Sequence, residues 1–74
     1  MACYEITYTN KQGLHCMVVV EASNAYIAKS WFAQYKQNHL SEIIYVGEIY
    51  GDLWQYQKKG VPFLEAKEEE IVSE

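Results

Sequence analysis

VVVEASNAYIAKSWFAQYK, residues 18–36, passes from a run of valines to a segment with helical spacing. The valines are typical of a strand, and the apolar residues after Ser23 recur every three or four positions, as in a helix with one buried stripe. Ser23 is the predicted N-cap, because its hydroxyl can accept from an unpaired N–H in the first turn. The residues expected to face the core are Ala25, Ile27, Ala28, Trp31, Phe32 and Tyr35.

The residues before this stretch predict a β-hairpin. Residues 3–9, CYEITYT, alternate apolar and polar side chains, as in a half-buried strand. A loop of residues 11–13 with Gly13 in the left-handed conformation pairs Tyr8 with Cys16 and sets apolar residues opposite apolar ones. A two-residue loop would turn the apolar side of the second strand to the polar face, so we predict the longer loop.

Residues 42–57, EIIYVGEIYGDLWQYQ, predict a second hairpin that turns at Gly51 and Asp52. Its core face is expected to hold Ile43, Tyr45, Gly47, Ile49, Trp54 and Tyr56. A glycine inside a strand marks a bulge or a ring packed on bare backbone, here the ring of Trp31 or Tyr56. The predicted fold is therefore α+β, with the order ββαββ: two antiparallel hairpins form one sheet, and a single helix packs on one face.

Residues 61–64, VPFL, allow two interpretations. Pro62 could begin a short C-terminal helix, or the segment could lie at a sheet edge, which we favour. Residues 1–64 then form one domain, and residues 65–74, EAKEEEIVSE, form a flexible acidic tail that carries all of the net charge of −4.

Composition and motifs argue against several functions. The chain has no arginine and residues 1–64 carry no net charge, which argues against nucleic-acid binding. No apolar run reaches the roughly 18 residues of a membrane span, so we expect a cytoplasmic protein. Cys3 and Cys16 lack metal-site spacing and fall on opposite faces of the hairpin, so both thiols should be free.

No catalytic, cofactor-binding or metal-binding residue is predicted, and we expect no enzyme activity. His15 adjoins Cys16, but neighbouring strand residues point to opposite faces, so the imidazole cannot activate the thiol. His39 falls near the helix C-terminus, where a structural role is the default.

The face of the sheet away from the helix is the predicted interaction surface. Its apolar residues are Met17, Val19, Ile44, Val46, Tyr50 and Leu53. An apolar set of this size needs a cover, which could be a second copy, a partner protein or the chain's own C-terminal segment. We predict a non-enzymatic protein–protein interaction module that forms a homodimer.

Three alternatives stay open. One is a small inhibitor or adaptor of the kind that phages and mobile elements encode, which rests on size alone. Another is a small-ligand pocket between helix and sheet near Tyr35, His39 and Trp54. The last is a nucleic-acid binder that stacks bases on aromatic residues such as Tyr50.

Overall fold

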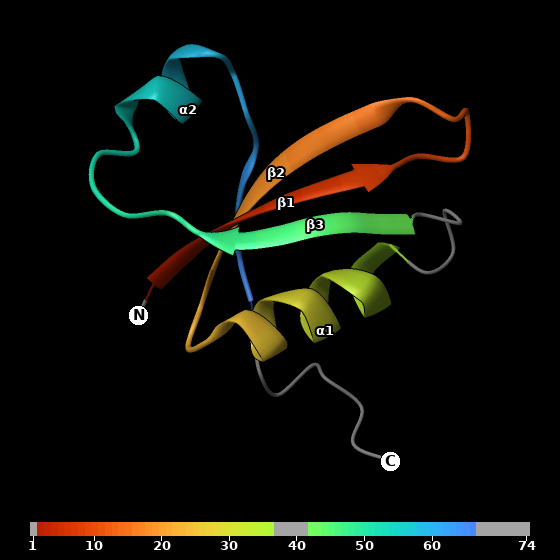
Figure 1. Cartoon of the computed structure of the whole chain (residues 1–74), viewed down its shortest axis with the longest axis horizontal. Helices are drawn as coiled ribbons and strands as arrows, with labels where there is room; N and C mark the ends of the chain where they lie inside the picture. Colours follow the sequence, from red (N-terminus) through yellow and green to blue (C-terminus); the bar gives the residue numbers. More distant parts are fainter. Residues whose placement is uncertain (1, 37–41, 67–74) are drawn as a thin grey trace.

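The part of the chain that the structure describes folds as a four-stranded mixed sheet with a twelve-residue helix on one face. A computed structural model describes residues 2–36 and 42–66. The elements are β1 (Ala2–Thr9), β2 (His15–Ala22), α1 (Ala25–Lys36), β3 (Glu42–Glu48), α2 (Trp54–Lys58) and β4 (Phe63–Glu65). The strands lie in the order β3-β1-β2-β4, and only β2 and β4 are parallel (Figure 1). The predicted α+β class is confirmed, whereas the ββαββ order of two antiparallel hairpins is wrong in its second half.

The first hairpin has the predicted register and loop. The pairs that share the face beneath α1 are Tyr8 with Cys16, Ile6 with Val18 and Tyr4 with Val20. Gly13 has a φ of 83°, a conformation that favours glycine. The side-chain oxygen of Asn10 accepts hydrogen bonds from the backbone N–H of Gln12 at 2.9 Å and of Leu14 at 3.0 Å. Asn10 thereby holds the loop closed from within.

The cap of α1 lies one residue later than predicted. The side-chain oxygen of Asn24 accepts a hydrogen bond of 2.9 Å from the backbone N–H of Ile27, so Asn24 takes the place expected for Ser23. Both residue types are favourable N-caps, and the sequence pattern alone does not choose between adjacent ones.

The core lies between α1 and the sheet. Its buried residues are Tyr4, Ile6, Val18, Val20, Ala22, Ala28, Trp31, Phe32 and Ala66. The middle of the predicted helical stripe is confirmed, whereas its two ends, Ala25 and Tyr35, are exposed. Tyr35 stacks along the Trp31 ring instead, with the ring centres 5.0 Å apart.

A β-bulge in β3 changes which residues face the core. The register between β3 and β1 shifts by one residue and leaves Ile44 without a partner on β1. Ile43 and Val46 therefore both pack against the core, although they are three positions apart. Tyr45 and Gly47 face the other side of the sheet, so their predicted place in the core is wrong. Strict alternation fails here because the bulge interrupts the two-residue period.

The predicted strand after β3 is the short helix α2. Asp52 accepts a hydrogen bond of 2.9 Å from the backbone N–H of Trp54 through its side-chain oxygen, and so it stabilises the start of the helix. Gly51 has a positive φ of 98°, as a turn at this place requires. The turn leads into a helix, however, so Trp54 and Tyr56 do not belong to a strand.

A glycine ends α2 in the manner of a Schellman motif. The N–H of Gly60 donates to the carbonyl of Gln57 at 3.1 Å, and that of Val61 donates to the carbonyl of Tyr56 at 3.1 Å. Gly60 has a φ of 76°. Both ends of this five-residue helix are thus fixed by hydrogen bonds.

The predicted edge segment near Pro62 is confirmed as β4. It pairs in parallel with β2, and the ladder is extended by bonds of 2.9 Å from Val19 N–H to the Pro62 carbonyl and from Ala66 N–H to the Glu21 carbonyl. Proline fits this edge because it needs to supply only an acceptor. Residues 67–74 of the predicted acidic tail lie outside the described residues.

Candidate functional site

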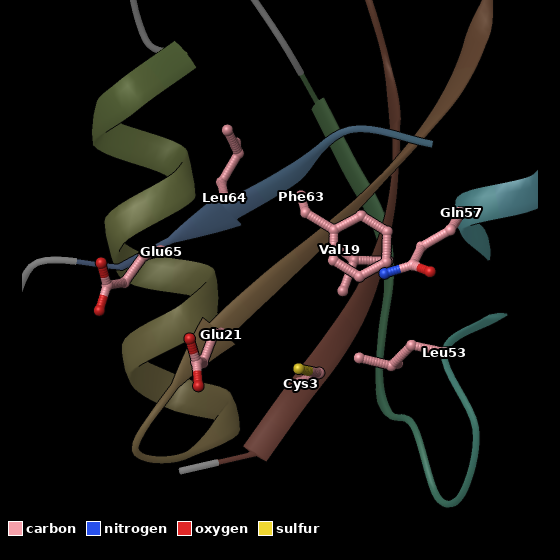
Figure 2. Close-up of a pocket in the computed structure, with 8 residues that line it drawn as sticks. All are labelled: Cys3, Val19, Glu21, Leu53, Gln57, Phe63, Leu64 and Glu65. Atoms are coloured by element: carbon pink, nitrogen blue, oxygen red, sulfur yellow. The ribbon is translucent and has the colours of Figure 1, made fainter. Parts of the chain in front are cut away.

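The outer face of the sheet is the face opposite α1. It carries the side chains of Cys3, Glu5, Thr7, Met17, Val19, Glu21, Tyr45, Phe63 and Glu65. The chain itself covers part of this face. The Tyr56 hydroxyl of α2 donates a hydrogen bond of 2.9 Å to Glu5 Oε1. Leu53, directly before α2, lines a groove on this face together with Cys3 (Figure 2).

The predicted surface residues lie in different environments. They are Met17, Val19, Ile44, Val46, Tyr50 and Leu53. Val46 is on the α1 side, because the bulge reverses its expected direction. Val19 is on the outer face as predicted, but only 1% of it is exposed. The other four are half-buried or exposed. Because Val46 faces α1 and Val19 is enclosed, the six residues do not form one continuous surface.

Tyr45 occupies the space above Gly47. A Cβ atom at position 47 would lie 2.6 Å from Cζ of the Tyr45 ring, so the glycine leaves room for the end of this ring. The ring predicted for this place, that of Trp31 or Tyr56, is therefore replaced by a neighbour on the same strand. Gly47 pairs with Glu5, so the Tyr45 ring beside Gly47 lies near the hydrogen bond between Glu5 and Tyr56 of α2.

The hydrogen bond between Tyr56 and Glu5 changes the acidity of the phenol. It raises the pKa of Tyr56 above the usual 10.0, and burial and the negative charges of Glu5 and Tyr45 add to the effect. A phenol that donates to a carboxylate resists deprotonation because ionisation would remove the bond and set two negative charges together. Tyr56 therefore stays a neutral donor at physiological pH.

A groove of about 340 Å³ lies between α2, β2 and β4 (Figure 2). It is lined by Cys3, Val19, Glu21, Leu53, Gln57, Phe63, Leu64 and Glu65. Leu53 and the Phe63 ring lie toward α2, and the two carboxylates lie at the other end. A second hollow of about 370 Å³ shares Cys3 and Leu53 and extends toward Tyr50. The loop before α2 thus separates two depressions of the outer face.

Cys3 lies in this groove as a free thiol whose pKa is raised. Burial raises the pKa of Cys3, and the nearby charge of Glu21 raises it further. Thiols react as thiolates, so a raised pKa lowers nucleophilicity at neutral pH. Both cysteines are free and lie on opposite faces of the hairpin, as the register predicted.

The described residues bring few reactive groups together. His15 lies on the outer side of β2, whereas Cys16 lies on the α1 side, where its sulfur accepts from Asn10 Nδ2 at 3.5 Å. Within residues 2–36 and 42–66, no group of three or more His, Cys, Asp or Glu side chains could hold a metal ion.

Two of the three polar-tipped residues of the expected small-ligand pocket, Tyr35 and Trp54, lie on elements at opposite faces of the sheet. Tyr35 is on α1, whereas Trp54 is on α2, which is anchored to the opposite face. Lys58 of α2 lies over the Trp54 ring, with Nζ 4.9 Å from its centre. His39 lies outside the described residues.

Sequence reasoning missed the groove because two of its walls were assigned incorrectly or left open. Leu53 directly precedes α2 and Gln57 belongs to it, and Phe63 and Glu65 belong to β4, whose parallel pairing is non-local. One local signal was present: Asp52 and Gly60 bracket the segment as a helix start and stop.

The comparisons with known proteins identify no relative. No family model matches the chain, and searches of curated proteins and of solved structures also find no match. Among the helices in the described part of the chain, none has the length and apolar character required to cross a membrane. Function is therefore inferred from the chain's own surface.

Proposed function

We propose that this chain is a non-enzymatic protein-binding module that acts through the outer face of its sheet. The observation that supports this most directly is the exposure of three large rings on the outer face and on α2, which covers part of it: Tyr45 is 54% exposed, Trp54 57%, and Phe63, which lines the groove, 39%. Exposed aromatic residues beside a partly apolar hollow are typical of protein-binding surfaces, where such rings supply contact area.

The charge of this face favours a protein partner over nucleic acid. Glu5, Glu21 and Glu65 all lie on the outer face, and carboxylates repel phosphates. Base stacking on Tyr45 or Phe63 would place a nucleic-acid backbone among these charges. We therefore place nucleic-acid binding behind protein binding.

The cover supplied by α2 changes how much surface a partner must bury. Val19 is already enclosed by the chain, so it does not require a second copy to shield it. The proposed contact residues are instead the exposed rings of the outer face and of α2, namely Tyr45, Phe63 and Trp54. A second copy of the chain is one candidate partner, and a different protein is the other.

Self-association is tested by light scattering of the full chain over a concentration series that reaches high micromolar values. Replacing Tyr45 and Trp54 by Ser should shift any dimer toward monomer, because it removes two exposed rings from the proposed interface. Tyr26→Ser is the matched control, since Tyr26 is 74% exposed but lies on α1.

Photo-crosslinking tests the partner directly. A photoreactive phenylalanine analogue at position 45 or 54 should give a discrete crosslinked product in the cells of origin, and the same analogue at position 26 should not. The proposal is overturned if the chain stays monomeric and the outer-face positions crosslink no better than position 26.

A further inference from the structure

The groove on the outer face has an apolar part and an acidic end. Its apolar part consists of Val19, Leu53 and Phe63, and its acidic end consists of Glu21 and Glu65 (Figure 2). A volume of about 340 Å³ is near the lower end of ligand pockets, which hold roughly 300–1,000 Å³. The groove is therefore large enough for one or two side chains of a bound segment.

The acidic end is formed by two glutamates at paired positions of adjacent strands. Glu21 pairs with Glu65 across the β2/β4 ladder, so both side chains point to the outer face from adjacent strands. Like charges directly opposite on a sheet destabilise it, and a cation between them would remove the repulsion. Within the described residues, neither carboxylate has a side-chain hydrogen bond or an ion pair.

The burial pattern separates the two ends of the groove. Val19 is fully enclosed, whereas Leu53 is half-buried and Phe63 is exposed, so an apolar side chain that enters here would remove the remaining surface of Leu53 and Phe63 from water. Glu21 and Glu65 are exposed and keep their hydration until a partner arrives. An occupant that suits both ends therefore has an apolar side chain and a neighbouring cation.

We propose that this groove binds a segment of a partner protein in which an apolar residue is followed closely by lysine or arginine. The apolar side chain lies against Leu53 and Phe63, and the cation lies between Glu21 and Glu65. The proposal rests on the protein-binding function proposed above and adds the chemistry of the partner. The chain's net charge of −4 also favours encounter with a basic partner.

Charge argues against the chain's own C-terminal residues as the occupant. Residues 67–74 contain four glutamates and one lysine, and this sequence would bring further negative charge to the acidic end. A second copy of the chain could present Lys58 or Lys59, which follow the aromatic residues of α2. If a second copy is the occupant, the variant Glu21→Gln/Glu65→Gln should also weaken self-association of the chain.

The test is a selection of random heptapeptides displayed on phage against the full chain, followed by NMR titration with the most enriched peptide. We expect enriched peptides to combine an apolar residue with lysine or arginine. The peptide should shift the amide signals of Cys3, Leu53 and Phe63. The variant Glu21→Gln/Glu65→Gln should weaken its binding about three- to tenfold, as the loss of two exposed ion pairs would.

Glu42→Gln/Glu48→Gln is the matched control, because it makes the same change in net charge at residues that do not line this groove. It should leave the affinity close to that of the original chain. The inference is overturned if no peptide is enriched, if enriched peptides lack a basic residue, or if the groove variant binds them as well as the control does. Outer-face shifts from a peptide without a basic residue would overturn this inference alone and leave the protein-binding proposal standing.

Discussion

Tyr56 and Glu5 are joined by a hydrogen bond of 2.9 Å across 51 positions of sequence. The bond connects α2 to the central strand of the sheet and helps hold Leu53 over the groove. Because the donor is a phenol and the acceptor is a carboxylate, the connection depends on the proton of Tyr56.

Because the hydrogen bond needs this proton, the free energy of unfolding should decrease at alkaline pH. The pKa of Tyr56 is raised in the folded chain, so its contribution is complete below the usual value of 10.0 and is lost as pH rises through the folded pKa. Denaturant unfolding between about pH 8 and pH 11 should show a shallower loss of stability in Tyr56→Phe than in the original chain. Tyr26→Phe is the control and should keep the original slope. Parallel curves for Tyr56→Phe and the original chain would show that the bond is not maintained in solution.

Phe32 should be among the most sensitive positions for folding. It is completely buried, with its ring centre 4.9 Å from that of Tyr8. Phe32→Ala should lower the free energy of unfolding by about 3–5 kcal/mol, which is a large share of the stability of so small a domain. Tyr26→Ala on the exposed side of the same helix should change it by less than about 0.5 kcal/mol. If Phe32→Ala and Tyr26→Ala lowered the free energy of unfolding equally in thermal and denaturant melts, the assignment of the helix faces would be wrong.

Gly47 and Tyr45 should be energetically coupled. Gly47→Ala forces the Tyr45 ring to move, because the new Cβ would overlap it. In a Tyr45→Ala background the same change meets no ring, and alanine should then be neutral or stabilise the strand by about 0.5–1 kcal/mol. A double-mutant cycle on the free energy of unfolding measures this difference. Additive effects would mean that the ring does not rest over residue 47.

The two thiols should remain unlinked after aerobic purification, and intact mass should show both cysteines reduced. Glu21→Gln should speed alkylation of Cys3 by iodoacetamide at mildly alkaline pH, because the Glu21 charge raises the pKa of that thiol. Glu42→Gln should leave the rate unchanged. A monomer lighter by two mass units would contradict the hairpin register.

The first half of the fold could be predicted from local patterns. The alternation in residues 3–9, the left-handed Gly13 and the stripe through Ala28, Trp31 and Phe32 each permit one arrangement that buries apolar residues together. These contacts join neighbouring elements, so sequence spacing fixes them.

The second half could not be predicted in the same way. Residues 43–46 are apolar at both parities, so period two leaves the face undecided and the bulge at Ile44 settles it. The Gly51-Asp52 pair suits a hairpin turn as well as a helix start, and a five-residue helix has too few positions to show a period. The groove depends on both of these features and on parallel pairing by β4, which forms far along the chain from β2.

The bulge also has a consequence for how copies of this chain meet. β3 is an edge strand, with no further strand beside it among the described residues, and a regular edge of seven residues would invite another chain to continue the sheet. The extra residue at Ile44 breaks the spacing of the backbone groups, and Glu42 and Glu48 place a negative charge at each end. Both features oppose edge-to-edge pairing of β3 with another chain and so limit growth of the sheet into fibrils.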